Sequence, residues 1–213
     1  MVLCLILILQ CNSLNQHTIF PLGIDAKWSS PAHIDIPDAY LKNWLLDTGS
    51  LTERLQSHCR EFQVSVLGQR QAALTLEEQQ QLGLAKPHYD EADWQVREVI
   101  LLGENQPWVF ARSIIPRSLC QSDFANLGNK PLGQLIFNDE RFKRSPFQVA
   151  HLSQPASLLM TLGFAKAEQL WGRRSVFALQ DMKMMVAEVF LPEAPAYKNI
   201  LHIIGGHRTD NAK

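Results

Sequence analysis

The sequence predicts a single α+β domain built on an antiparallel β-sheet. Two pairs of segments indicate β-hairpins, because they are dense in β-branched and aromatic residues and are joined by short turn-forming linkers. These pairs are Trp94–Leu102 with Trp108–Ile115, and Ser175–Leu179 with Met184–Leu191. A regular alternation of strands and helices, which would indicate a parallel sheet, is missing. The 213 residues, 46% of them hydrophobic, are sufficient for one domain with a complete core.

Three short helices are predicted before the first hairpin, over residues 37–48, 50–55 and 75–82. The first has Pro37 at its first position and is stopped by Gly49. The other two begin with capping boxes, in which a Ser or Thr is followed by Glu three residues later.

Three further segments complete the expected elements. Phe62, Val64 and Val66 alternate with polar residues, which predicts a half-buried strand. Residues 131–137 form a short apolar segment that begins with Pro-Leu-Gly. Residues 138–170 are expected to mix loop and helix.

Composition and motifs exclude several classes of function. Twenty basic and 21 acidic residues give a formal net charge of −1, so no nucleic-acid or anionic-membrane partner is expected. Phosphate-binding, dinucleotide-binding, zinc-protease and serine-hydrolase motifs are missing. The four cysteines form no C-x-x-C pair and stand near no histidine cluster. We therefore expect no cofactor, no metal and reduced cysteines.

The N-terminus contains an unbroken apolar run, Val2–Leu9. A membrane-spanning helix needs about 20 residues, so this run is too short to span. It also lacks the preceding basic residue and the following small-residue cleavage site of a signal peptide. We interpret residues 1–20 as an extension, either an extra edge strand or the result of a start codon placed too far upstream.

Glu188 is the residue that points to chemistry. It is the one polar residue in Met184–Leu191, whose two faces are equally apolar, so the strand is expected to be covered on both sides. A buried carboxylate must be paired, hydrogen-bonded or protonated. Arg97 and Arg112, inside the strands of the first hairpin, offer the opposite charge.

Two interpretations of these charges stay open on the pattern alone. Glu188 and one of the two arginines could form a structural ion pair. Alternatively, they could line an apolar pocket for a small ligand with a carboxylate at one end and a hydroxyl at the other. The adjacent Arg173 and Arg174 enter a strand and point to opposite faces, so at most one can reach such a pocket.

Five motifs carry a resemblance to a known family. They are Trp44-Leu45-Leu46 with Ser50-Leu51-Thr52-x-Arg54; Trp94-x-x-Arg97-Glu98-Val99-x-Leu101-Leu102 with Pro107-Trp108 and Arg112-x-x-x-Pro116; Lys130-Pro131-Leu132-Gly133-x-x-x-Phe137; Trp171-Gly172-Arg173-Arg174-Ser175; and Glu188-x-Phe190-Leu191-Pro192. In this order, over roughly residues 40–197, they resemble the motifs of bacterial chorismate pyruvate-lyases.

The resemblance implies a fold and a reaction. The fold would be a monomeric domain, residues 21–197, with a six-stranded antiparallel sheet and helical flaps over a buried ligand, followed by a tail of residues 198–213. The reaction would split chorismate into 4-hydroxybenzoate and pyruvate without a cofactor, in the cytoplasm, for ubiquinone synthesis. The rival hypothesis is a non-catalytic module that binds aromatic carboxylates, since ligand-sensing domains of some transcription regulators resemble this fold.

The resemblance also implies roles for individual residues. Arg97 would bind the ring carboxylate and Glu188 would accept a hydrogen bond from the 4-hydroxyl, which makes both candidate catalytic residues. Leu51 and Leu132 would form walls of the cavity. Either Arg173 or Arg112 would meet the enolpyruvyl carboxylate.

Overall fold

The computed structural model describes residues 20–84, 89–125, 127–128, 130–137, 139–153, 156–164 and 169–197, with only the backbone described for residues 156 and 157. The apolar run Val2–Leu9 and the predicted tail, residues 198–213, lie outside these ranges, as does all but the last residue of the predicted extension 1–20.

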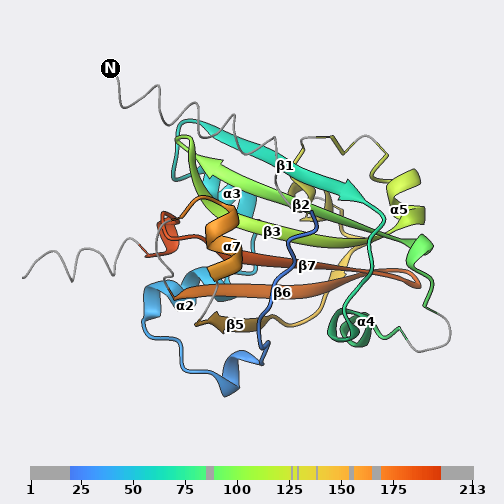
Figure 1. Cartoon of the computed structure of the whole chain (residues 1–213), viewed down its shortest axis with the longest axis horizontal. Coiled ribbons are helices and arrows are strands. Elements are labelled where there is room, and N and C mark those ends of the chain that lie inside the picture. Colours follow the sequence, from blue (N-terminus) through green and yellow to red (C-terminus); the bar gives the residue numbers. More distant parts are fainter. Residues whose placement is uncertain are drawn as a thin grey trace, which may run out of the picture.

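Seven strands form one antiparallel sheet, which confirms the predicted fold class. Their order is β1-β2-β3-β7-β6-β4, and β5 pairs with β6 beside β4 (Figure 1). The strands are β1 (Phe62–Arg70), β2 (Trp94–Gly103), β3 (Gln106–Pro116), β4 (Lys143–Arg144), β5 (Gln148–Leu152), β6 (Leu170–Leu179) and β7 (Met182–Phe190).

Both predicted hairpins are present, with longer strands and tighter turns than expected. Glu104 and Asn105 alone connect β2 to β3, and both have positive φ angles, as the commonest two-residue hairpin turn requires. A bulge between Leu101 and Leu102 then shifts the pairing of β2 with β3 by one residue. Two residues also connect β6 to β7.

The region 138–170 is more regular than the sequence predicted. It contains β4, β5 and the helix α7 (Ala156–Thr161), so the expected mixture of loop and helix was wrong about the strands. Strand β4 has two residues and β5 has five. Segments this short carry too little alternation to be recognised as strands in a sequence.

Short capped helices connect the strands. They are α2 (Ala39–Leu46), α3 (Leu51–Gln56), α4 (Leu76–Leu82), α5 (Arg117–Gln121) and α6 (Leu132–Phe137), together with single 3-10 turns at Pro31–His33, Glu91–Asp93 and Pro195–Tyr197. The predicted start of α2 at Pro37 was wrong, because the Asp38 carboxylate accepts from the N–H groups of Tyr40 and Leu41 and caps the helix. The capping box of α4 is complete at Thr75 and Glu78.

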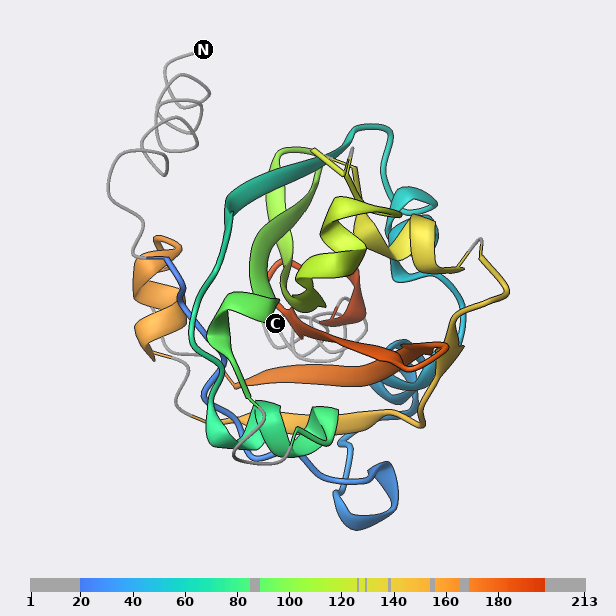
Figure 2. The ribbon, with the colours of Figure 1, turned by 90° about the vertical axis from the view of Figure 1, so that its right-hand side faces the viewer.

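The sheet has two covered faces. The pocket face carries Val99, Leu101 and Ala111, and α2 and α3 pack on it, with α5 and α6 over the far ends of the strands. The rear face carries Ile100, Phe110 and Val189, and it is covered by α7 and residues 22–28, with α4 at one end. In Figure 2 the sheet is strongly curved, with α7, in orange, on its outer side and the yellow-green helices α5 and α6 on its inner side.

No helix among these described segments is long and apolar enough to cross a membrane.

Candidate active site

A cavity lies between the pocket face of the sheet and the helices α3 and α6. Its walls come from five strands, from α3 and α6, and from the segment around β4. The lining residues are Leu51, Thr52, Val64, Arg97, Val99, Leu101, Ala111, Ser113, Pro131, Leu132, Gly133, Ile136, Phe137, Arg144, Phe147, Arg173, Ser175, Phe177, Val186 and Glu188. Five of the six residues singled out in the sequence are therefore brought together; Arg112 is not.

Strand register explains why Arg97 and Glu188 share this cavity. Arg97 pairs with Ser113 on β3, which pairs in turn with Val186 on β7, two residues before Glu188. Two positions along a strand is one full side-chain period, so both charged side chains project from the same face. Usual strand spacing and rise put their α-carbons about 12 Å apart.

Arg97 is a buried arginine without a carboxylate partner among the residues that the structure describes. Its side chain is oriented by Gln69 Oε1, 2.8 Å from Nη1, and by the carbonyl of Lys130, 3.2 Å from Nη2. Burial lowers the pKa of Arg97, against a small opposing effect of Cys120. An anion in the cavity would supply the counter-charge that the described protein groups do not.

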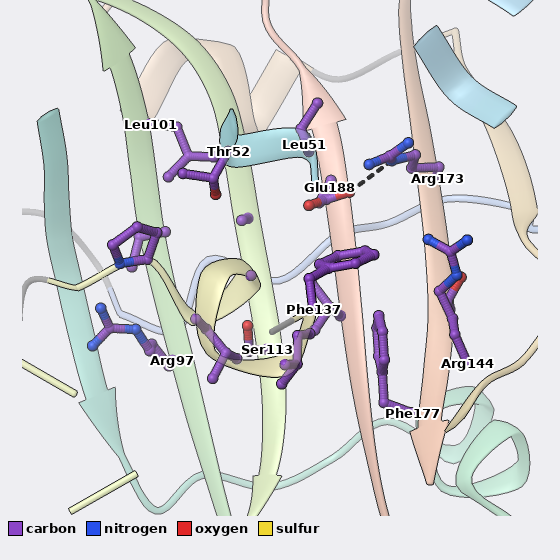
Figure 3. A pocket seen from close by; sticks show the side chains of 18 of the residues that line it. Leu51, Thr52, Arg97, Leu101, Ser113, Phe137, Arg144, Arg173, Phe177 and Glu188 are labelled. Carbon is purple, nitrogen blue, oxygen red and sulfur yellow. Dashed lines mark hydrogen bonds and ion pairs between the residues drawn. The ribbon is translucent and has the colours of Figure 1, made fainter. Parts of the chain in front are cut away.

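Glu188 has a different partner from the two considered in the sequence. Its Oε2 accepts from Arg173 Nε at 2.7 Å, and the two residues are directly paired across β7 and β6 (Figure 3). Arg173 Nη1 also donates to the carbonyls of Trp44 and Asp47. Glu188 therefore forms no ion pair with Arg97 or Arg112, the two partners considered in the sequence, and pairs with Arg173 instead; its Oε1 accepts no hydrogen bond from a described residue.

Arg112 faces the rear of the sheet and does not reach the cavity. It donates to Glu78 from Nε at 2.8 Å and to Glu98 from Nη1 at 2.7 Å. Burial lowers the pKa of Arg112, but the hydrogen bonds and charges of Glu78 and Glu98 outweigh that effect, and the pKa is raised overall. The expectation that Arg112 could contact a second ligand carboxylate is therefore wrong, because the bulge in β2 pairs it with Glu98 on the opposite face from Arg97.

Two short helices close the cavity, as the flap prediction required. Leu51 and Thr52 begin α3, and Leu132 begins α6. Leu51 and Leu132 are both buried, so the cavity walls are apolar where they approach the charged residues. Gly133 lies directly under α3, where a Cβ atom would come within 3.2 Å of the Thr52 hydroxyl.

Sequence reasoning did not single out four polar residues of the cavity, Thr52, Ser113, Arg144 and Ser175. Ser113 and Ser175 lie level with Arg97 in the strand register and are buried. The Ser175 hydroxyl has no hydrogen-bond partner among the described residues. Strand alternation from Arg97 and Glu188 could have placed both serines once the hairpin registers were known. Arg144, on β4, follows no such pattern.

The arrangement suits a flat, largely apolar ligand with charge at both ends. In Figure 3 Arg97 stands at one side of the cavity, Glu188 between, and Arg173 with Arg144 at the other side. The walls between these groups are mainly aliphatic and aromatic side chains. Across the described residues, no group of three or more His, Cys, Asp or Glu side chains could hold a metal ion.

Comparison with known proteins finds one family. Residues 23–200 match the model of the chorismate lyase family. A curated relative from Pseudoalteromonas atlantica, called probable chorismate pyruvate-lyase, is 56% identical over 180 residues, covering 84% of this chain and 93% of the relative. One of the same description from Shewanella frigidimarina is 36% identical over 207 residues, covering 84% of this chain and 95% of the relative.

Among solved structures, a similar fold occurs in the effector domain of PhnF from Mycobacterium smegmatis. The TM-score is 0.52 with 12% sequence identity, and the alignment covers 68% of this chain and 90% of that domain. At this identity the likeness concerns the fold alone.

Proposed function

Because the chain belongs to the chorismate lyase family, we propose that it is a chorismate pyruvate-lyase, a carbon–oxygen lyase that converts chorismate into 4-hydroxybenzoate and pyruvate. The observation that carries the proposal is Arg97. It is a buried cation with no carboxylate partner among the described residues, and it lines the same largely apolar cavity as Glu188.

Arg97 would bind the carboxylate on the ring. Gln69 and the Lys130 carbonyl hold the guanidinium in place, and its remaining N–H groups can make the paired hydrogen bonds that a carboxylate accepts. Substrate and product share this carboxylate, so the binding of both should depend on Arg97.

Glu188 would accept a hydrogen bond from the 4-hydroxyl. Its Oε2 is held by Arg173, so Oε1 is the atom available to the ligand. The ion pair with Arg173 fixes the orientation of the carboxylate. Leu51 and Leu132 would press on the two sides of the ring from the flap helices.

The reaction needs little protein chemistry beyond this. Chorismate loses the proton at C4, the C4–H electron pair becomes the new ring double bond, and the C3–oxygen bond breaks to release enolpyruvate, which takes up a proton to become pyruvate. Formation of the aromatic ring supplies the driving force. The cavity would contribute by holding the side chain in a reactive conformation, excluding water and balancing the developing negative charge.

The proposal includes four further points from the resemblance. The domain would comprise residues 21–197, act as a monomer and lie in the cytoplasm. Its product would enter ubiquinone synthesis, for which 4-hydroxybenzoate is a precursor. Size-exclusion chromatography with light scattering checks the monomeric state, and restoration of ubiquinone in a lyase-deficient bacterium checks the last point.

The direct test is incubation of the purified chain with chorismate. We expect 4-hydroxybenzoate and pyruvate to appear in equal amounts, and turnover to persist in EDTA, because arginines in the cavity supply the counter-charges for the substrate. Binding of 4-hydroxybenzoate without any turnover of chorismate would instead favour the non-catalytic binding module.

A further inference from the structure

Arg144 is a second cation in the cavity whose hydrogen-bonding groups are unused. It is half-buried on β4, at the opposite side of the cavity from Arg97 (Figure 3). It makes neither a hydrogen bond nor a salt bridge with any residue that the structure describes. Its guanidinium lies instead over two aromatic rings, 4.3 Å from the centre of Phe147 and 5.4 Å from that of Phe137.

Aromatic contacts of this kind hold a guanidinium in position without using its N–H donors. Burial lowers the pKa of Arg144, and the nearby charge of Arg173 lowers it further, with Glu188 and Asp47 opposing. The side chain is therefore oriented, charged and short of a counter-charge. An anionic group at this end of the cavity would remove that deficit.

The net charge of the cavity lining is equal and opposite to the charge of the proposed substrate. Arg97, Arg144 and Arg173 face one carboxylate, Glu188, so the lining residues carry two unbalanced positive charges. Chorismate carries two carboxylates, one on the ring and one on the enolpyruvyl group. A ligand with only a ring carboxylate would leave one of the two positive charges unmatched.

Arg173 is the weaker candidate for the second carboxylate. Its Nε is bonded to Glu188 and its Nη1 donates to two main-chain carbonyls. Its charge is thus already balanced, and its donors are mostly engaged. The Phe147 ring lies against both guanidiniums, 4.8 Å from that of Arg173, so the two like charges share an aromatic spacer.

We propose that Arg144 binds the enolpyruvyl carboxylate and thereby selects ligands with two carboxylates over ligands with one. This inference rests on the proposed function. Arg144 holds the leaving side chain, whereas Arg97 holds the ring, so the two arginines should differ in which ligands depend on them. Because the leaving group departs as an anion, the contact at Arg144 should favour both binding and bond breakage.

The experiment compares Arg144→Met with Arg97→Met and with Lys143→Met, an exposed neighbour on the same strand. Affinities are measured for 4-hydroxybenzoate and for a benzoate that bears an enolpyruvyl ether at the meta position, which carries both carboxylates and cannot react. Loss of a charge-assisted hydrogen bond predicts that Arg144→Met binds the two-carboxylate ligand at least about tenfold more weakly. Its affinity for 4-hydroxybenzoate should be unchanged.

Arg97→Met should lose affinity for both ligands, and Lys143→Met for neither. Retained 4-hydroxybenzoate binding by Arg144→Met also shows that this variant is folded. Arg144→Lys keeps the charge and should restore part of kcat/KM for chorismate. If Arg144→Met binds the two-carboxylate ligand normally, or loses both ligands equally, the inference is wrong. Absence of chorismate turnover in the unaltered chain is the separate result that defeats the proposed function.

Discussion

The pocket face and the rear face of the sheet hold arginines in opposite electrostatic situations. On the rear face, Arg112 contacts two carboxylates and Arg174 contacts Glu77 and Gln148. On the pocket face, Arg97 has no carboxylate partner among the described residues, and Arg144 has no hydrogen bond to any of them. Both faces are buried and both carry the same residue type. The rear-face arginines are neutralised by protein carboxylates, whereas Arg97 and Arg144, which we propose to bind the ligand, are not.

The rear-face carboxylates show how complete that neutralisation is. Glu98 is fully buried and accepts from Arg112 and from the main-chain N–H groups of Leu22 and Gly23. Glu78 accepts from Arg112 and caps α4 through the N–H of Thr75. One arginine therefore links the N-terminal segment, α4 and the sheet. The charges of the rear face are thus paired within the fold, whereas Arg97 and Arg144 on the pocket face have no carboxylate partner among the described residues.

The largest expected effect is that of Arg112→Met on stability. Removing one member of a buried charge network leaves the other charges unpaired, which costs about 3–5 kcal/mol of unfolding free energy. Urea unfolding measured by circular dichroism gives this quantity, and Glu98→Gln should show a smaller loss in the same direction. A stability equal to that of the unaltered chain would mean that the rear-face network does not support the fold.

Arg97→Met should instead weaken ligand binding and leave stability nearly unchanged. The binding free energy of 4-hydroxybenzoate should fall by about 1.5–3 kcal/mol, at least about tenfold in affinity, because a charge-assisted hydrogen bond is lost. Stability should change little, since no described carboxylate is left unpaired. Calorimetric titration and urea unfolding on the same sample measure both. A sharp fall in stability with normal ligand affinity would identify Arg97 as structural and remove the contrast between the faces.

Glu188→Gln is the intermediate case, because Glu188 belongs to an ion pair and also faces the cavity. Glutamine keeps the size and an acceptor oxygen, so 4-hydroxybenzoate should bind more weakly by about 1 kcal/mol, the difference between a charged and a neutral hydrogen bond. Benzoate, which lacks the hydroxyl, should bind both forms equally. Equal weakening of both ligands would argue against a contact between Glu188 and the hydroxyl.

The smallest effect should come from Glu77→Gln on the rear face. Its partner Arg174 is buried, but the Glu77 side chain is 51% exposed, so solvent already screens the pair. Half-exposed ion pairs of this kind contribute less than about 1 kcal/mol. Unfolding free energy should fall by no more than this, and ligand affinity should stay constant. If the unfolding free energy falls as much as it does in Arg112→Met, solvent exposure does not determine how much each rear-face ion pair contributes to stability.

Much of this arrangement could be predicted from the sequence, and a single bulge explains the main error. Strand alternation identified Arg97 and Glu188, and residue chemistry identified the need for a partner. If the hairpin continued from the Gly103–Gln106 pair without interruption, Arg97 would lie opposite Arg112 on one face. The bulge between Leu101 and Leu102 places Arg97 opposite Ser113 and Glu98 opposite Arg112 instead.

Arg144 and Asp38 show what alternation and capping rules leave out. Arg144 lies on a strand of two residues, and a period of two cannot be read from two residues. At α2, Pro37 and Asp38 are both acceptable near a helix start, and only the hydrogen bonds of Asp38 decide between them. Local rules limit the alternatives, whereas long-range pairing selects among them.

The brevity of β4 has a consequence for how this protein family can diversify. Two residue pairs, Lys143 with Ala178 and Arg144 with Phe177, attach β4 to β6, and the next residue, Ser145, adds hydrogen bonds to Val176. A short segment at the margin of the sheet tolerates insertions and deletions better than the central strands that carry Arg97 and Glu188. If Arg144 binds the second carboxylate as proposed, that contact can therefore change in evolution independently of the strands that hold Arg97 and Glu188.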